Sequence, residues 1–131
     1  MKLKLEYLAG CGTFSECRFR TPFYEKEVSG LAFICRSGPA VWEPQSLLLV
    51  CAGMIPGGGE QLALWLDERK GRGAAGFLAD LSGEEEERID ALAKACRERE
   101  LVFGTVAADR FVSLINEYSH LIASRTDGTV R

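Results

Sequence analysis

The segment from residue 53 to residue 60 has the glycine content of a phosphate-binding loop and lies between an apolar run and a predicted helix. Many nucleotide sites are built in this order, because backbone N–H groups at a helix N-terminus hold phosphate. A Walker loop also needs Lys and a hydroxyl residue after Gly58, where this chain has Gly59 and Glu60, and the pattern GxGxxG is absent. A flexible connection is therefore favoured over a phosphate site. The ligand contacts that we expect from this loop are Gly53, Pro56, Gly57, Gly58 and Gly59.

Two more candidate ligand contacts, Asp80 and Thr105, come at the ends of predicted strands. In open α/β sheets, ligands bind beyond the carboxyl ends of the strands. Asp80 can bind a ligand there or simply hydrogen-bond the next turn. Asp109, after the following strand, could share one cleft with Asp80, and two carboxylates can do general acid–base chemistry only when they lie close together.

The chain offers few nucleophiles and bases. His120 is the only histidine, so a Ser–His or Cys–His relay would depend on this residue alone. An ordinary surface or half-buried histidine is the favoured interpretation, and we expect no catalytic residues and no enzyme activity. The alternative is a small α/β enzyme in which Asp80, Asp109, His120 or a cysteine converge in the strand-end cleft.

The five cysteines do not form a metal-binding pattern. Their number is odd, no pair has CxxC spacing, and a zinc site would need paired short spacings. Each lies in or beside an apolar segment, which indicates small, buried, reduced thiols in a cytoplasmic protein. We therefore expect no metal site and no cofactor. The cysteines are Cys11, Cys17, Cys35, Cys51 and Cys96.

Composition and charge limit the partners of this chain. A chain of 131 residues is long enough for one domain with a core of its own. The net charge is −3 and the basic residues are scattered, which argues against direct contact with nucleic acid. No apolar run is long enough to span a membrane and the N-terminus lacks a signal-peptide pattern, so we expect a cytoplasmic protein without membrane contact.

Strands and helices alternate in the second half of the sequence. Apolar runs over 47–52, 74–81 and 101–106 are typical of strands that are covered on both faces. Amphipathic patterns predict helices over 60–71, after Ser82, and from Asp109 onwards. This order implies parallel strands joined by right-handed crossovers. We predict a single α/β domain with a mostly parallel sheet of about five strands and helices packed on it.

The ends of the predicted helices carry their own signals. Ser82 and Glu85 have the spacing of a capping box, and the acidic run over 84–87 is more typical of a helix start than of a metal site. Asp109 can cap the last helix. The apolar face of that helix, which Val112 and Ile122 widen, either packs in the core or meets a partner subunit, with core packing favoured.

The first half of the sequence is less regular. The segment KLKLEYLAG predicts a short helix, residues 16–21 alternate as an edge strand does, and residues 28–34 resemble another buried strand. Residues 35–46 form a loop rich in Gly and Pro. The polar tail over 124–131 is expected to fray.

Taken in order, these segments resemble the N-terminal sensory domain of PucR-type transcriptional regulators, the purine-catabolism-regulator-like domain. The likeness covers nearly the whole chain, and its succession is more specific than any one motif. The chain departs from the family pattern where two threonines are replaced by Val50 and Cys51. The matching segments are KLEYLAGC, EVSGLAFI, WEPQSLLLVCAG, the helix over 60–71, GAAGFLADL, ERIDALAKACRERELVFGTV and DRFVSLINEY.

The resemblance implies a regulatory function. It predicts a non-catalytic domain that senses a small-molecule effector, such as a metabolite of purine catabolism, and forms a homodimer. Direct DNA binding belongs to a C-terminal helix-turn-helix in that family, so no nucleic-acid contact is expected from this chain. A pure dimerisation or interaction domain without a ligand pocket is the remaining alternative.

Overall fold

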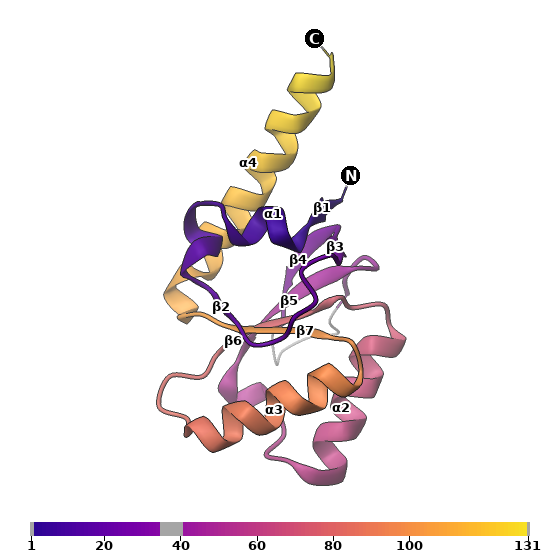
Figure 1. The fold of residues 1–131 in the computed structure, drawn as a ribbon, viewed down its shortest axis with the longest axis vertical. Helices are drawn as coiled ribbons and strands as arrows, with labels where there is room; N and C mark the ends of the chain where they lie inside the picture. Colours follow the sequence, from indigo (N-terminus) through magenta and orange to yellow (C-terminus); the bar gives the residue numbers. More distant parts are fainter. Residues whose placement is uncertain (1, 35–40, 131) are drawn as a thin grey trace.

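A five-stranded sheet organises the fold in the computed structural model, which describes residues 2–34 and 41–130, with side chains up to residue 124. The strands are Arg18–Phe19 (β2), Gly30–Phe33 (β4), Ser46–Cys51 (β5), Gly76–Asp80 (β6) and Val102–Thr105 (β7). Their order across the sheet is β2-β7-β6-β5-β4, with β2 antiparallel to β7 and the other neighbours parallel (Figure 1). The predicted α/β class, with a mostly parallel five-stranded sheet in a single domain, is confirmed.

The central strands are buried on both faces, which explains their continuous apolar sequences. Every residue of β5 from 46 to 50 is buried, and so are residues 76–79 of β6 and 102–104 of β7. Because these strands are parallel, their carboxyl ends at Cys51, Asp80 and Thr105 lie along one edge of the sheet.

Two helices cover one face of the sheet, namely α2 (Gly59–Gly71) and α3 (Glu86–Glu98) (Figure 1). Their apolar side chains share a buried cluster with Phe77 and Phe103 of the sheet. The predicted stripe of α3 is confirmed, because Ile89, Leu92, Ala93 and Cys96 are all buried in this cluster. In α2 the half-buried ring of Trp65 packs edge-on against Phe77, with 5.4 Å between the ring centroids.

The opposite face is covered by the two ends of the chain. Phe111, Leu114 and Tyr118 pack there with Leu49, Leu78 and residues of the N-terminal segment. In Figure 1 the last helix continues past the N-terminal segment and projects beyond the rest of the molecule. The elements on this face are β1 (Leu3–Lys4), α1 (Leu5–Ala9), the 3₁₀ turns η1 (Gly12–Glu16) and η3 (Ala108–Arg110), and α4 (Phe111–Val130), while β1 pairs with β3 (Glu27–Val28) in a small second sheet.

Two expectations for the first half are confirmed and one is corrected. The short helix and the edge strand are present as α1 and β2. The strand expected to be buried over 28–34 is instead the edge strand β4, in which Phe33 is 48% exposed. Only β5 pairs with β4, so its outer edge lacks a neighbouring strand among the described residues. The first half of the loop predicted after this strand, residues 35–40, lies outside the described residues.

The predicted helix caps are wrong. The backbone N–H and hydroxyl of Ser82 donate to Asp80, so α3 begins at Glu86 with Glu85 as its N-cap, and the capping box is not formed. The acidic residues do occupy the start of the helix, as expected. Asp109 lies inside η3 rather than at the cap of α4. The last helix, α4, continues to Val130.

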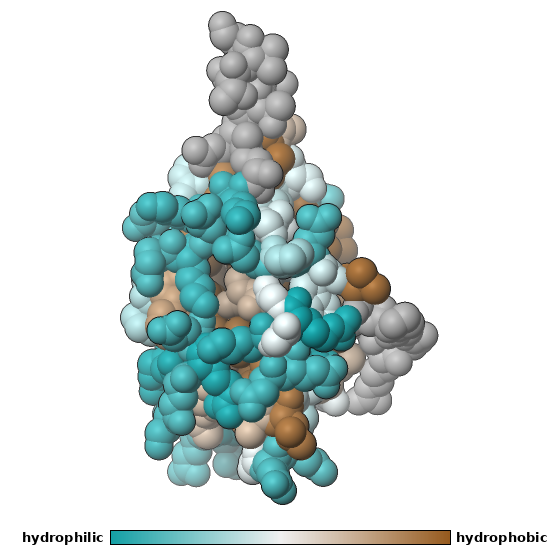
Figure 2. All heavy atoms as spheres, turned by 90° about the vertical axis from the view of Figure 1, so that its right-hand side faces the viewer, coloured by the Kyte–Doolittle hydropathy of each residue, from teal (hydrophilic) through white to brown (hydrophobic). Residues whose placement is uncertain are grey.

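The surface view gives a largely hydrophilic face on which hydrophobic residues form small, separate areas (Figure 2). Isolated exposed hydrophobic residues are common on soluble proteins and do not by themselves mark an interface. Within residues 2–34 and 41–130, the helices are too short or too polar to cross a membrane.

Candidate functional site

The ligand contacts expected from the sequence line two different cavities. Asp80 and Thr105 line a cavity of about 290 Å³ at the carboxyl ends of β6 and β7, which we call the strand-end cavity. Pro56, Gly57, Gly58 and Gly59 line a cavity of about 250 Å³ between α2 and α3, which we call the helix cavity. Gly53 lies in the 3₁₀ turn η2 (Ala52–Met54) and is not among the described lining residues of either cavity.

The strand-end cavity brings together segments that are far apart in the sequence. Its lining combines apolar side chains with carboxylates, hydroxyls and one guanidinium group. A cavity of this size is at the lower limit of the range of roughly 300–1,000 Å³ that is usual for ligand sites, so it would hold a compact molecule. The lining residues are Glu16, Arg18, Asp80, Leu81, Ser82, Ile89, Thr105, Val106 and Ala107.

Asp80 fastens two loops at the edge of the sheet. Its Oδ1 accepts hydrogen bonds from the hydroxyl of Ser82 at 2.6 Å and from the backbone N–H of Ser82 at 3.0 Å. Its Oδ2 accepts one from the backbone N–H of Ala108 at 2.9 Å. These bonds, led by that of the Ser82 hydroxyl, lower the pKa of the Asp80 carboxyl, so it stays ionised at neutral pH.

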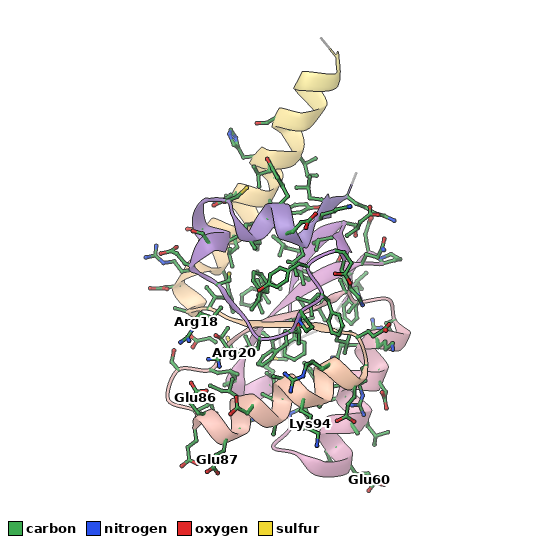
Figure 3. All side chains as sticks on the ribbon, viewed as in Figure 1. Arg18, Arg20, Glu60, Glu86, Glu87 and Lys94 are labelled. Carbon is green, nitrogen blue, oxygen red and sulfur yellow. The ribbon has the colours of Figure 1, made fainter. Side chains whose placement is uncertain are left out.

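Arg18 and Thr105 supply the uncommitted polar groups of the cavity. They are directly opposite each other in the antiparallel pair of β2 and β7, so both side chains lie on the same face of the sheet. Neither side chain has a hydrogen-bond or ion-pair partner within the described part of the chain. Figure 3 shows Arg18 and Arg20 on the side of β2 that faces the first turn of α3.

Neighbouring charges are already paired. Arg20 contacts Glu86 of α3, with 3.4 Å between Nη1 and Oε2. Glu16 pairs with Arg110 at 3.6 Å, but both side chains are about half exposed, so this ion pair is weak. Arg18 is therefore the cation of this rim that remains available to a ligand.

The helix cavity is lined by the glycine loop and by small or apolar residues of α2 and α3. Gly59 has a φ of +61°, a backbone conformation that favours glycine, and a Cβ there would meet nothing within 4 Å. Arg88 on the opposite wall donates to the carbonyl of Ile55 at 3.1 Å and pairs with Glu84 at 2.7 Å. The glycine loop thus folds as a strand-to-helix connection that α3 holds in place, and the cation facing it is engaged within the protein.

The residues considered for catalysis do not gather in the strand-end cavity. His120 is exposed on α4, as predicted for an ordinary surface histidine, and Asp109 is exposed in η3. Neither of these two lines the cavity beside Asp80. Among the residues described, no group of three His, Cys, Asp or Glu side chains is placed to hold a metal ion.

The cysteines differ from one another in burial. Cys17 and Cys96 are buried, as predicted, and burial raises the pKa of each thiol to about 12. Cys11 is half-buried, whereas Cys51 at the end of β5 is exposed, contrary to the expectation for all five. Cys35 lies outside the described residues.

The walls of the strand-end cavity are tied directly to α4. The N–H of Thr13 in η1 donates to Oε2 of Glu117 in α4 at 2.7 Å. Glu16 of η1 pairs with Arg110, the residue before α4, and Asp80 binds the N–H of Ala108. Glu16 and Asp80, two of the lining residues, are therefore connected to the start of the last helix through short contacts.

Comparisons with protein-family models, with curated proteins and with solved structures found no match to this chain.

Sequence reasoning missed three polar lining residues of the strand-end cavity, namely Glu16, Arg18 and Ser82. The alternation over residues 16–21 predicted only an exposed or edge strand. It contained no information about which strand this segment would pair with. Only the pairing with β7 places Arg18 beside Thr105.

Proposed function

We propose that this chain is a non-catalytic, small-molecule-sensing regulatory domain of a PucR-like transcriptional regulator, acting in the cytoplasm. Its effector, a compact polar metabolite such as a product of purine catabolism, binds in the strand-end cavity. The chain itself makes no contact with DNA or with a membrane. The resemblance in the order of segments and the scattered positions of Asp109 and His120 support this proposal.

One observation carries the proposal, which is that the cavity walls are fastened to α4. η1, which contributes Glu16 to the rim, is held by Glu117 of α4 through the N–H of Thr13. A ligand that draws the rim inwards changes the position of η1 relative to α4. Since α4 projects beyond the rest of the molecule (Figure 1), a small change at its base becomes a larger displacement at its far end.

Sensing then works as a population shift. The domain exists in two arrangements of η1 and α4, and the effector stabilises the arrangement to which it binds more tightly. The size of the response depends on the difference between the effector's affinities for the two arrangements, because a ligand that binds both equally does not shift the equilibrium between them.

We also propose that the domain acts as a homodimer in which α4 contributes to the contact. Val112 of α4 is 68% exposed, and the projecting part of this helix has no neighbouring element in Figure 1. Sedimentation velocity at several concentrations tests this part separately. A monomer at all concentrations would contradict the dimer without affecting the ligand site.

A thermal-shift screen tests the sensing proposal, with purines, allantoin, related ureides and a general set of polar metabolites at millimolar concentration. A ligand present at roughly 100 times its Kd stabilises the fold by about 2.7 kcal/mol, which raises the Tm by several degrees. Hydrogen exchange should then show protection in η1 and at the base of α4.

Two variants assign the response to one cavity. Thr105→Val removes the hydroxyl from the strand-end cavity and should weaken the response, whereas Ala91→Leu fills the helix cavity and should leave it unchanged. The opposite pattern would place the ligand in the helix cavity. If no compound of the screen stabilises the protein, the sensing proposal is wrong.

A further inference from the structure

The charges of the strand-end cavity restrict the chemistry of its ligand. Its lining holds two carboxylates, those of Glu16 and Asp80, and one guanidinium, that of Arg18. A simple cation would be repelled by Arg18, and a simple anion would meet both carboxylates. A ligand that carries an acidic group at one end and N–H donors at the other complements all three charges.

Arg18 is suited to hold the acidic group. Its guanidinium can form a bidentate hydrogen-bonded ion pair with a carboxylate. Among the described residues the Arg18 side chain has no ion-pair partner. Thr105, directly opposite on β7, adds a hydroxyl that can donate to the same carboxylate.

The carboxylates are suited to accept N–H groups. A carboxylate offers about four acceptor positions, and Asp80 uses three of them, on Ser82 and Ala108. Oδ2 of Asp80 therefore keeps one position for a ligand. Glu16 is held only by a half-exposed ion pair with Arg110, so most of its acceptor capacity is also available.

The remaining wall is apolar and short. Leu81, Ile89 and Val106 supply apolar side chains to the lining, against which an apolar part of a ligand can pack. With a volume of about 290 Å³, the cavity suits a compact molecule with a short apolar or planar centre.

From these contacts we propose that the ligand of the strand-end cavity is a compact carboxylate bearing N–H donors, bound with its carboxylate at Arg18 and Thr105 and its N–H groups at Glu16 and Asp80. This inference rests on the proposed sensing function and restricts it to one chemical class. Ureido acids and amino acids both belong to this class, and they differ in whether the N–H groups are neutral or charged.

Titration calorimetry with four small probes tests the proposal. N-carbamoylglycine represents ureido acids, β-alanine represents amino acids, N-carbamoylglycinamide lacks the carboxylate, and methoxyacetate lacks the N–H donors. We expect one of the first two to bind and the matched compounds to bind roughly tenfold more weakly or worse, because each lacks a charged or charge-assisted contact. Which of the two binds identifies the source of the N–H groups.

Matched variants assign the contacts. Arg18→Gln should strongly reduce the preference for the carboxylate over the amide, because it removes the cation. Glu16→Gln should reduce the preference for N–H donors, which Asp80 still accepts. Lys94→Gln and Glu60→Gln remove the same charges far from the cavity (Figure 3) and should change neither preference. Circular dichroism and Tm of each variant establish that it is folded.

The results separate this inference from the sensing function. The ligand class is wrong if the carboxylate and amide probes bind equally, or if none of the four probes binds. It is also wrong if Arg18→Gln leaves the preference for the carboxylate over the amide unchanged. The sensing function then depends on the wider screen, in which a stabilising neutral or cationic metabolite would preserve it. If that screen also yields no ligand, both proposals are wrong.

Discussion

At the scale of single residues, Asp80 shows how one side chain can hold a site together and still face a ligand. Three hydrogen bonds from Ser82 and Ala108 fix its carboxylate at the carboxyl end of β6. The alternative weighed from the sequence, that Asp80 hydrogen-bonds the next turn, is confirmed, because Ser82 belongs to that turn. A ligand would use only the acceptor position that remains.

Asp80→Asn should lower the free energy of unfolding by about 1 to 2 kcal/mol at pH 7. Both oxygens of Asp80 accept hydrogen bonds, and in the variant one of them is replaced by an NH₂ group, which cannot accept. The lowered pKa of Asp80 fixes the sign of the pH dependence. The carboxylate contributes its full stabilisation of the fold at pH values above its pKa in the unfolded chain, which is about 3.9. This stabilisation is lost as the pH falls through the lower pKa that the group has in the folded protein. Urea denaturation at several pH values should therefore show the gap between wild type and variant narrowing in acid.

The exposed carboxylate of Asp109 provides the control for this measurement. Asp109→Asn should change stability by no more than about 0.5 kcal/mol at any of these pH values. A gap between wild type and Asp80→Asn that widens in acid would contradict the assigned hydrogen bonds.

Gly76 provides a second residue-scale prediction. A Cβ at this position would lie 2.0 Å from the carbonyl oxygen of Val102, which belongs to the neighbouring strand and has no room to move. Gly76→Ala should therefore cost about 3 kcal/mol or more, measured by urea denaturation. Gly57→Ala, where a Cβ meets nothing within 4 Å, should remain within about 1 kcal/mol of wild type.

At the scale of elements, the contact between η1 and α4 is the feature on which signalling would depend. Glu117 accepts the N–H of Thr13, and Gly12 lies so close to the same carboxylate that an added Cβ would be 2.6 Å from it. Gly12 also has a φ of +28°, a backbone conformation that favours glycine, so this turn depends on glycine for its conformation.

Glu117→Ala should release η1 locally while the sheet remains folded. We expect the amide of Thr13 to exchange roughly tenfold faster, because it loses its acceptor, with a loss of about 1 kcal/mol in global stability. Hydrogen exchange followed by NMR measures both effects. Asn116→Ala, at an exposed neighbouring position of α4, is the control and should leave η1 unchanged. Unchanged exchange at Thr13 in Glu117→Ala would mean that η1 is not held by α4 in solution.

At the scale of the whole molecule, the sheet separates two buried clusters, one on each of its faces. Cys96 lies in the cluster beneath α2 and α3, and Cys17 lies in the cluster beneath α4 and the N-terminal segment. Burial raises the pKa of both thiols to about 12, so almost none of either thiol is ionised near neutral pH.

Thiol labelling can test whether these clusters open as one unit. In a variant with Cys11, Cys35 and Cys51 replaced by Ser, Cys17 and Cys96 should react with a disulfide reagent only through global opening, at similar slow rates. In urea above the unfolding midpoint, both should react at once. Rapid labelling of Cys17 alone in the native protein would show that the α4 side opens independently.

The sequence by itself determined the fold class, because the alternation of apolar runs with amphipathic stripes admits few arrangements other than a parallel sheet covered by helices. It also located Asp80 and Thr105 at strand ends. It misplaced the N-cap of α3 because a Ser82 hydroxyl can either cap a helix or donate to a neighbouring carboxylate. Only the folded chain shows that it donates to Asp80, at 2.6 Å.

Tertiary structure alone decided which residues share a cavity. The glycine loop and Asp80 lie at the carboxyl ends of adjacent strands, yet they line different cavities, because the loop faces α2 and α3 whereas Asp80 shares its cavity with residues of β2 and β7. Arg18 lies in the site because it pairs with Thr105, a residue 87 positions later in the chain. Local patterns specify elements through short-range periodicity, whereas long-range pairing depends on the packing of the whole sheet, which no local pattern encodes.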